Sequence, residues 1–108
     1  MAEDTDAGSI LAEVYKVILE RQRTLPPDSY VAKLLAQGID RIAKKVGEEA
    51  TEVVIAAKNQ SCEELAFEVA DLWFHSLVLL AACGVPLDDV WKQLAARRGQ
   101  RRPETGTE

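Results

Sequence analysis

Two pairs of acidic residues are spaced so that each pair would share one face of a helix. Glu49 and Glu52 are three positions apart, as are Glu68 and Asp71, and residues i and i+3 of an α-helix are neighbours on its surface. Carboxylates that converge between packed helices repel: two unit charges about 4 Å apart cost about 4 kcal/mol at an effective dielectric constant near 20. A hard divalent cation removes this repulsion and prefers oxygen ligands. The spacing therefore predicts a carboxylate site for Mg²⁺ or Mn²⁺.

Other metals fit these residue types less well. Zinc favours Cys and His ligands, which this chain does not group. A di-iron bundle would need Glu-x-x-His on two helices, but Asp71 stands where a histidine is required and His75 is the only histidine. His75 follows Asp71 by one helical turn. It either packs as an ordinary helix residue or orients the Asp71 carboxylate from outside the ligand set.

The first acidic pair needs a helix over about residues 39–58. In that helix Lys45, Glu49 and Glu52 are expected along one border of the apolar stripe, where core meets solvent. Lys44 and Lys45 precede the acids and are either a solvated pair or point charges for ligand phosphates beside the metal. The apolar stripe is expected to consist of Ile42, Val46, Ala50, Val53, Val54 and Ala57.

The second acidic pair lies in a segment that is apolar nearly all round, over residues 65–83. The sequence from Ser61 to Glu64 fits the S-x-x-E capping box that opens a helix. Such an apolar helix belongs in a bundle core or a subunit interface, which predicts a homodimer or larger homo-oligomer. One polar stripe interrupts it, and charged residues are rarely buried unless paired or coordinated, which supports the metal site. This stripe consists of Glu64, Glu68, Asp71 and His75.

The remaining chain predicts an all-α fold of four principal helices plus a short one. Apolar periodicity indicates a helix from Ser9 to about Gln22, a short helix over about residues 30–36, and a last helix that begins at Pro86. Asp28 or Ser29 can cap the short helix. Residues 1–8 are expected to form a disordered tail, residues 9–98 one domain, and residues 99–108 a flexible tail.

Composition excludes several classes of function. A net charge of −5 over 108 residues argues against nucleic acid as the partner, although a small phosphorylated ligand can bind through a metal. Cys62 and Cys83 form no CxxC pair and are expected to be reduced thiols. With no signal peptide and no apolar run near 20 residues, a cytoplasmic protein without a membrane partner is expected. The sequence contains neither a P-loop nor a nucleophile elbow, and it offers no obvious candidate residue for covalent catalysis.

Several longer stretches resemble the phosphoribosyl-ATP pyrophosphatase family. They are SYVAKL at residues 29–34, KVGEEATEVVIAAK at residues 45–58, EVADL at residues 68–72 and GVPLDDV at residues 84–90. The resemblance runs from about Leu11 to Arg98. It implies a MazG-like helical bundle, completed by dimerisation, of the all-α nucleoside-triphosphate pyrophosphatases, whose shared signature is Glu-Glu-x-x-Glu followed by Glu-x-x-Asp.

The resemblance also implies an activity and residue roles. The activity is Mg²⁺-dependent hydrolysis of phosphoribosyl-ATP to phosphoribosyl-AMP and pyrophosphate, the second step of histidine biosynthesis. A stand-alone enzyme is expected, because 108 residues leave no room for the cyclohydrolase domain found in fused forms. By this resemblance, Glu49, Glu52, Glu68 and Asp71 would be the Mg²⁺ ligands, and Glu48 would be an outer ligand or the residue that orients the attacking water. Lys33, Lys44 and Lys45 would contact the substrate phosphates. In the expected mechanism, Glu48 or Glu52 would accept the proton of the attacking water.

Two alternatives use the same sequence features. A house-cleaning pyrophosphatase of the same superfamily would act on dUTP, dCTP or a damaged nucleotide, and a panel of substrates separates it from the first hypothesis. In a non-catalytic helical adaptor, the acidic residues would lie on a helical bundle without any chemical role. That hypothesis predicts neither stabilisation by Mg²⁺ nor hydrolysis of any nucleotide.

Overall fold

A computed structural model describes the backbone of residues 7–98 and the side chains of residues 10–98. The described chain is entirely helix and connecting turns, which confirms the all-α prediction. Its helices are α1 (Ala7–Thr24), α2 (Tyr30–Gln37), α3 (Ile39–Lys58), α4 (Cys62–Cys83) and α5 (Leu87–Ala96). Helix α1 starts two residues before the expected Ser9, and the rest of the expected N-terminal tail and the whole C-terminal tail lie outside the described residues.

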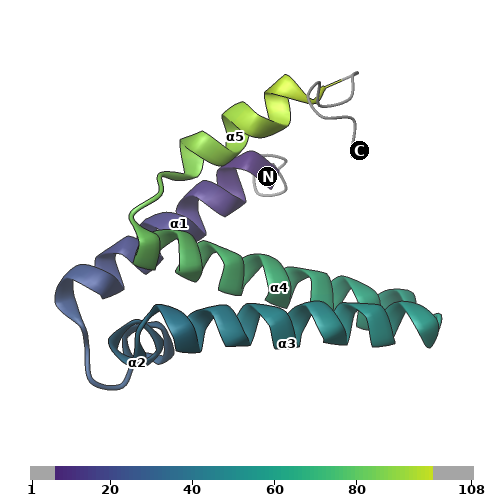
Figure 1. Ribbon diagram of the computed structural model, residues 1–108, viewed down its shortest axis with the longest axis horizontal. Coiled ribbons are helices and arrows are strands. Elements are labelled where there is room, and N and C mark those ends of the chain that lie inside the picture. The colour runs from purple at the N-terminus through teal and green to yellow at the C-terminus, as the bar shows by residue number, and fades with distance from the viewer. Residues whose placement is uncertain (1–6, 99–108) are drawn as a thin grey trace.

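Helices α3 and α4 form a long antiparallel hairpin that dominates the structure (Figure 1). The short helix α2 packs at the end of the hairpin where α3 begins. Helix α1 contacts both α2 and α4, whereas α5 extends from the end of α4 away from α3. The hairpin therefore brings one residue of each predicted acidic pair, Glu49 and Asp71, close together.

Local sequence explains where these helices begin and end. The Ser29 hydroxyl accepts a hydrogen bond from the Ala32 amide, and the Ser61 hydroxyl accepts one from the Glu64 amide. Each serine satisfies an amide that has no partner within its own helix. Gly84 ends α4 in the left-handed conformation with φ of 72°, which glycine adopts without a steric penalty. The caps predicted at Ser29 and Ser61 are thus confirmed, whereas Ser9, which the sequence also favours as a cap, lies inside α1.

The hydrophobic core lies at the α2 end of the hairpin and draws on all five helices. Ile18, Ile42 and Val78 are its largest fully buried side chains. The Tyr15 hydroxyl donates a hydrogen bond to the Val85 carbonyl oxygen at 2.7 Å, which ties α1 to the turn after α4. The core consists of Tyr15, Ile18, Val31, Leu34, Ile42, Leu77, Val78, Ala81 and Leu87.

The buried face of α3 differs from the expected one. The buried residues are Ile42, Glu49 and Ala56, spaced seven apart along one line of the helix. Val54, part of the expected stripe, is exposed. The expected apolar stripe follows the most hydrophobic positions of α3, but α3 packs against the polar stripe of α4. Glu49 consequently lies inside the hairpin and not at its border.

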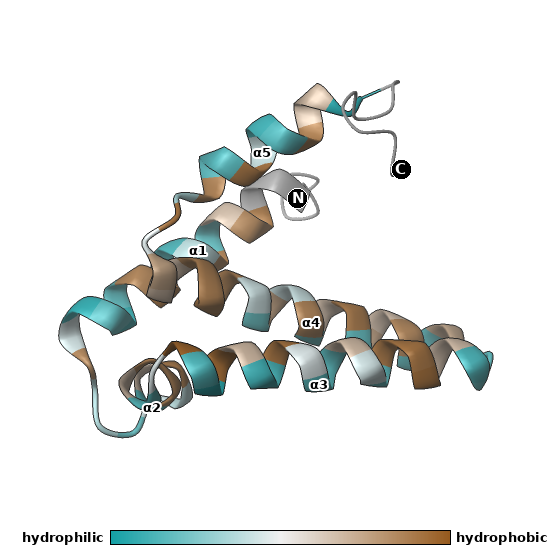
Figure 2. Cartoon of the chain, viewed as in Figure 1, coloured by the Kyte–Doolittle hydropathy of each residue, from teal (hydrophilic) through white to brown (hydrophobic). Residues whose placement is uncertain are grey.

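Helix α4, predicted to lie in a bundle core or a subunit interface, is only partly covered in the single chain. Phe67 is 67% exposed and Trp73 is 52% exposed, because α3 and α1 cover only part of its circumference. Figure 2 shows hydrophobic residues along much of the length of α4. By length and composition α4 is also the one helix in the described part of the chain that could cross a membrane. Core helices of soluble proteins pass the same test, and Glu68 and Asp71 interrupt its apolar surface.

Candidate metal centre

The hairpin brings together one residue of each predicted acidic pair. Glu49 from α3 and Asp71 and His75 from α4 each offer a ligand atom, and these atoms lie within 4.8 Å of one another. Glu49 is only 6% exposed and His75 only 3% exposed, while Asp71 is half-buried. A buried carboxylate requires a compensating positive charge.

Lys45 supplies positive charge to Glu49. Its Nζ atom lies 3.4 Å from Glu49 Oε2 and 3.8 Å from Glu48 Oε1. The hydrogen bond with Glu49 raises the pKa of the Lys45 ammonium, with the nearby charges of Glu49 and Glu48 acting in the same direction against the effect of burial. The Lys45 ammonium therefore lies beside the carboxylates, at a position where their negative charge favours its protonated form.

Glu52 and Glu68 belong to the same electrostatic cluster. Burial raises the pKa of the Glu68 carboxyl, and the negative charges of Glu52, Glu49 and Asp71 raise it further. Like charges disfavour the ionised form of a neighbouring acid. The other three carboxylates predicted as metal ligands thus act on Glu68, and a divalent cation would relieve this repulsion. These residues fit the predicted metal.

His75 occupies both of its ring nitrogens within the protein. Its Nδ1 lies 2.8 Å from the backbone oxygen of Asp71 and 3.3 Å from Asp71 Oδ1. Its Nε2 lies 2.8 Å from the hydroxyl of Tyr30, at the start of α2. With both nitrogens engaged, His75 is placed beside the carboxylates as a supporting residue and not as an additional ligand.

Tyr30 is the site residue that sequence reasoning did not identify. It stands within the SYVAKL stretch, but no periodicity relates it to His75, which is 45 positions later. Burial raises the pKa of the Tyr30 hydroxyl, and the nearby charges of Asp71 and Glu49 raise it while Lys45 and Arg41 oppose them. The Tyr30 hydroxyl therefore lies close enough to the carboxylates to be affected by their negative charge.

Of the predicted phosphate contacts, Lys45 pairs with the acidic residues. Lys33 and Lys44 are exposed and form no ion pair with the described side chains. Glu48 is half exposed and faces Lys45 from outside the buried group. Fold and site together define a helical-hairpin domain with a shared carboxylate cluster between its two longest helices.

The chain belongs to the phosphoribosyl-ATP pyrophosphohydrolase family, whose model matches residues 11–98. It is 57% identical to the phosphoribosyl-ATP pyrophosphatase of Trichlorobacter lovleyi over 90 residues, covering 83% of each chain. It is 53% identical to the enzyme of the same name from Geotalea daltonii, covering 83% of this chain and 85% of that one. The resemblance seen in the sequence is confirmed.

Longer relatives carry the same region as part of a larger protein. The histidine biosynthesis bifunctional protein HisIE of Thermus thermophilus is 50% identical over 104 residues, which are 96% of this chain and 49% of that one. The chain therefore spans about half the length of this bifunctional relative and most of the length of the monofunctional ones.

Proposed function

We propose that this chain hydrolyses phosphoribosyl-ATP to phosphoribosyl-AMP and pyrophosphate in histidine biosynthesis. The family match over residues 11–98 supports the substrate. The observation that carries the chemistry is the group of carboxylates where α3 and α4 meet, with Glu49 buried, Asp71 half-buried and the pKa of Glu68 raised by burial and its acidic neighbours. A cytoplasmic location follows from this pathway.

Glu49, Glu52, Glu68 and Asp71 would hold Mg²⁺, with Mn²⁺ as a substitute. When bound, the ion would neutralise charge on the triphosphate oxygens and lower the pKa of a bound water. Acid side chains and main-chain oxygens are the ligands that these hard cations prefer. The cluster offers carboxylate oxygens and no thiolate among the described residues.

The surrounding residues have separate roles in this proposal. Glu48 or Glu52, both exposed to solvent, would accept the proton of the attacking water. Lys45 would exchange its contact with Glu49 for a substrate phosphate once the carboxylates are neutralised. Lys33 and Lys44 would contribute attraction for the anionic substrate from the surrounding surface.

Pyrophosphate release from phosphoribosyl-ATP tests the proposal, with dUTP and ATP assayed alongside, each with and without Mg²⁺. Mg²⁺-dependent release from phosphoribosyl-ATP alone is expected. Pyrophosphate release only from another nucleotide would instead assign the chain as a house-cleaning pyrophosphatase. Folded protein that releases pyrophosphate from none of the three substrates would contradict an enzymatic function.

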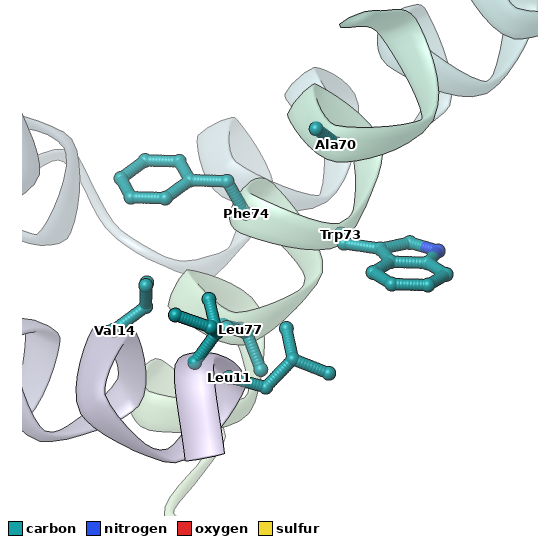
Figure 3. A pocket seen from close by; sticks show the side chains of 7 residues that line it. Leu11, Val14, Ala70, Trp73, Phe74 and Leu77 are labelled. Carbon is teal, nitrogen blue, oxygen red and sulfur yellow. The ribbon is translucent and has the colours of Figure 1, made fainter. Parts of the chain in front are cut away.

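The proposal includes a homodimer built on the uncovered side of α4. An apolar pocket lies between α1 and α4, with Leu11, Val14, Phe74 and Leu77 around it and Trp73 at its outer side (Figure 3). A second groove, of about 620 Å³, continues from Trp73 to Trp91 and Leu94 of α5. Continuous apolar surface of this kind marks an interaction site. A second copy of the chain would cover it.

Replacing Trp73 by lysine should convert the dimer into a folded monomer, because Trp73 borders both apolar depressions. Sedimentation equilibrium at micromolar concentration measures the change, and circular dichroism checks that helix content is retained. The control is Asp28→Lys, which adds the same side chain at an exposed turn and should leave the dimer intact. A wild-type protein that sediments as a monomer would refute the dimer.

A further inference from the structure

We propose that His75 and Tyr30 form a positioning unit that orients the Asp71 carboxylate toward the bound cation. The inference rests on the proposed metal site and adds two residues to it that are not ligands. Residues that hydrogen-bond to metal ligands fix the orientation of those ligands, and losing one costs about 10–100-fold in metal affinity.

The first contact holds Asp71. His75 Nδ1 lies 2.8 Å from the Asp71 backbone oxygen. A carbonyl oxygen only accepts hydrogen bonds, so Nδ1 must carry the proton. The same N–H group lies 3.3 Å from Asp71 Oδ1. His75 thus anchors the turn of α4 that carries Asp71 and places its ring against one oxygen of the Asp71 carboxylate.

The second contact holds the far side of the His75 ring. With the proton of the neutral imidazole on Nδ1, Nε2 is an acceptor, and the Tyr30 hydroxyl 2.8 Å away donates to it. The partner of one ring nitrogen decides which tautomer is present, and here that partner is the Asp71 carbonyl oxygen, because a hydroxyl can either donate or accept. Tyr30 therefore completes the hydrogen bonding of the ring and fixes its orientation beside Asp71. The rings of Tyr30 and His75 meet edge to face, with centroids 5.8 Å apart.

The unit connects the metal site to a separate part of the fold. Tyr30 opens α2, directly after the Ser29 cap, and the hydrogen bond to His75 joins α2 to α4 across 45 positions of sequence. His75 also packs edge to face against Phe74, with centroids 5.4 Å apart. Its ring is therefore held from α2 and α4 before any cation arrives, which is the preorganisation that a metal ligand requires.

Two substitutions of His75 separate positioning from packing. The amide nitrogen of asparagine reaches about the place of Nδ1, so His75→Asn can still donate to Asp71, whereas glutamine reaches about the place of Nε2 and His75→Gln cannot. Mn²⁺ affinity, measured by electron paramagnetic resonance of the free ion, should fall about 10–100-fold in His75→Gln and only a few-fold in His75→Asn. Thermal unfolding of the metal-free variants serves as the control for stability.

The tautomer is tested without any metal. His75 is the only histidine of the chain, so ¹⁵N nuclear magnetic resonance of its imidazole is unambiguous. The wild type should carry its proton on Nδ1, and Tyr30→Phe, which leaves the Asp71 carbonyl in place, should keep the proton there while the ¹⁵N resonance of Nε2 moves because its hydrogen bond is lost. A wild-type imidazole protonated on Nε2 alone would overturn the inference.

The outcomes of the Mn²⁺ titration also separate this inference from the proposed function. Wild-type protein that binds no Mn²⁺ would refute the metal site and the positioning unit together. Tight binding by the wild type and equally tight binding by His75→Gln would refute the positioning unit alone. Equal losses in His75→Gln and His75→Asn, each matched by the same drop in metal-free stability, would assign His75 to packing instead.

Discussion

Substitution of Glu49 by glutamine is expected to lower turnover about a thousandfold, because a bound cation contributes several kcal/mol of charge stabilisation and each 1.36 kcal/mol is a factor of ten in rate. Glutamine keeps the size of the buried side chain and removes only its charge. Mg²⁺ affinity, measured by isothermal titration calorimetry, should fall by about a hundredfold or more. Steady-state pyrophosphate release gives the turnover.

The fold should survive this substitution. Lys45 keeps Glu48 as a partner at 3.8 Å, so no buried cation is left alone, and the loss of a partly exposed ion pair costs about 1 kcal/mol or less. The matched control is Glu63→Gln, an exposed acid in the first turn of α4, which should leave both turnover and affinity unchanged. Near-normal activity of Glu49→Gln would refute the carboxylate site.

Substitution of Glu68 by glutamine should have opposite effects on the metal-free and metal-loaded protein. Burial and the neighbouring acids raise the pKa of Glu68 above its ordinary 4.5, so the folded state binds this proton more tightly than the unfolded chain. Stability contributed by the protonated group is full below the ordinary pKa and is lost as the pH rises through the raised pKa. At pH 7 the uncharged glutamine avoids this loss.

Metal-free Glu68→Gln should therefore melt at a higher temperature than the wild type at pH 7, and the difference should shrink as the pH falls below 4.5. With saturating Mg²⁺ the order should reverse, because the wild type gains binding energy in the folded state that the variant lacks. Differential scanning calorimetry with and without Mg²⁺ measures both effects. Glu63→Gln is again the control. A lower melting temperature for metal-free Glu68→Gln at pH 7 would show that the acids do not repel one another in the fold.

Much of this protein follows from local patterns in its sequence. The serine caps at residues 29 and 61, the glycine stop at residue 84 and the spacing of apolar residues depend on interactions within a few positions of the chain. Such interactions are the same in any fold, so the helices could be located from the sequence to within a few residues. The i, i+3 spacing of the acids is local in the same sense.

The orientation of α3 could not be obtained in this way. Hydrophobicity placed Val54 in the packed stripe and Glu49 at its border, and the structure exposes the former and buries the latter. The face of α4 that meets α3 carries Asp71 and His75 beside Glu49, so the two helices pack along these polar residues and leave Val54 exposed.

The contact between Tyr30 and His75 depended wholly on tertiary structure. A hydrogen bond between residues 45 positions apart exists only once α2 has packed on the hairpin, and no periodicity of one helix contains it. Sequence determined the helices and the acids, because those depend on neighbours along the chain. Tertiary packing decided which acid is buried, which lysine accompanies it and which residues hold the histidine, because these depend on how separate helices meet.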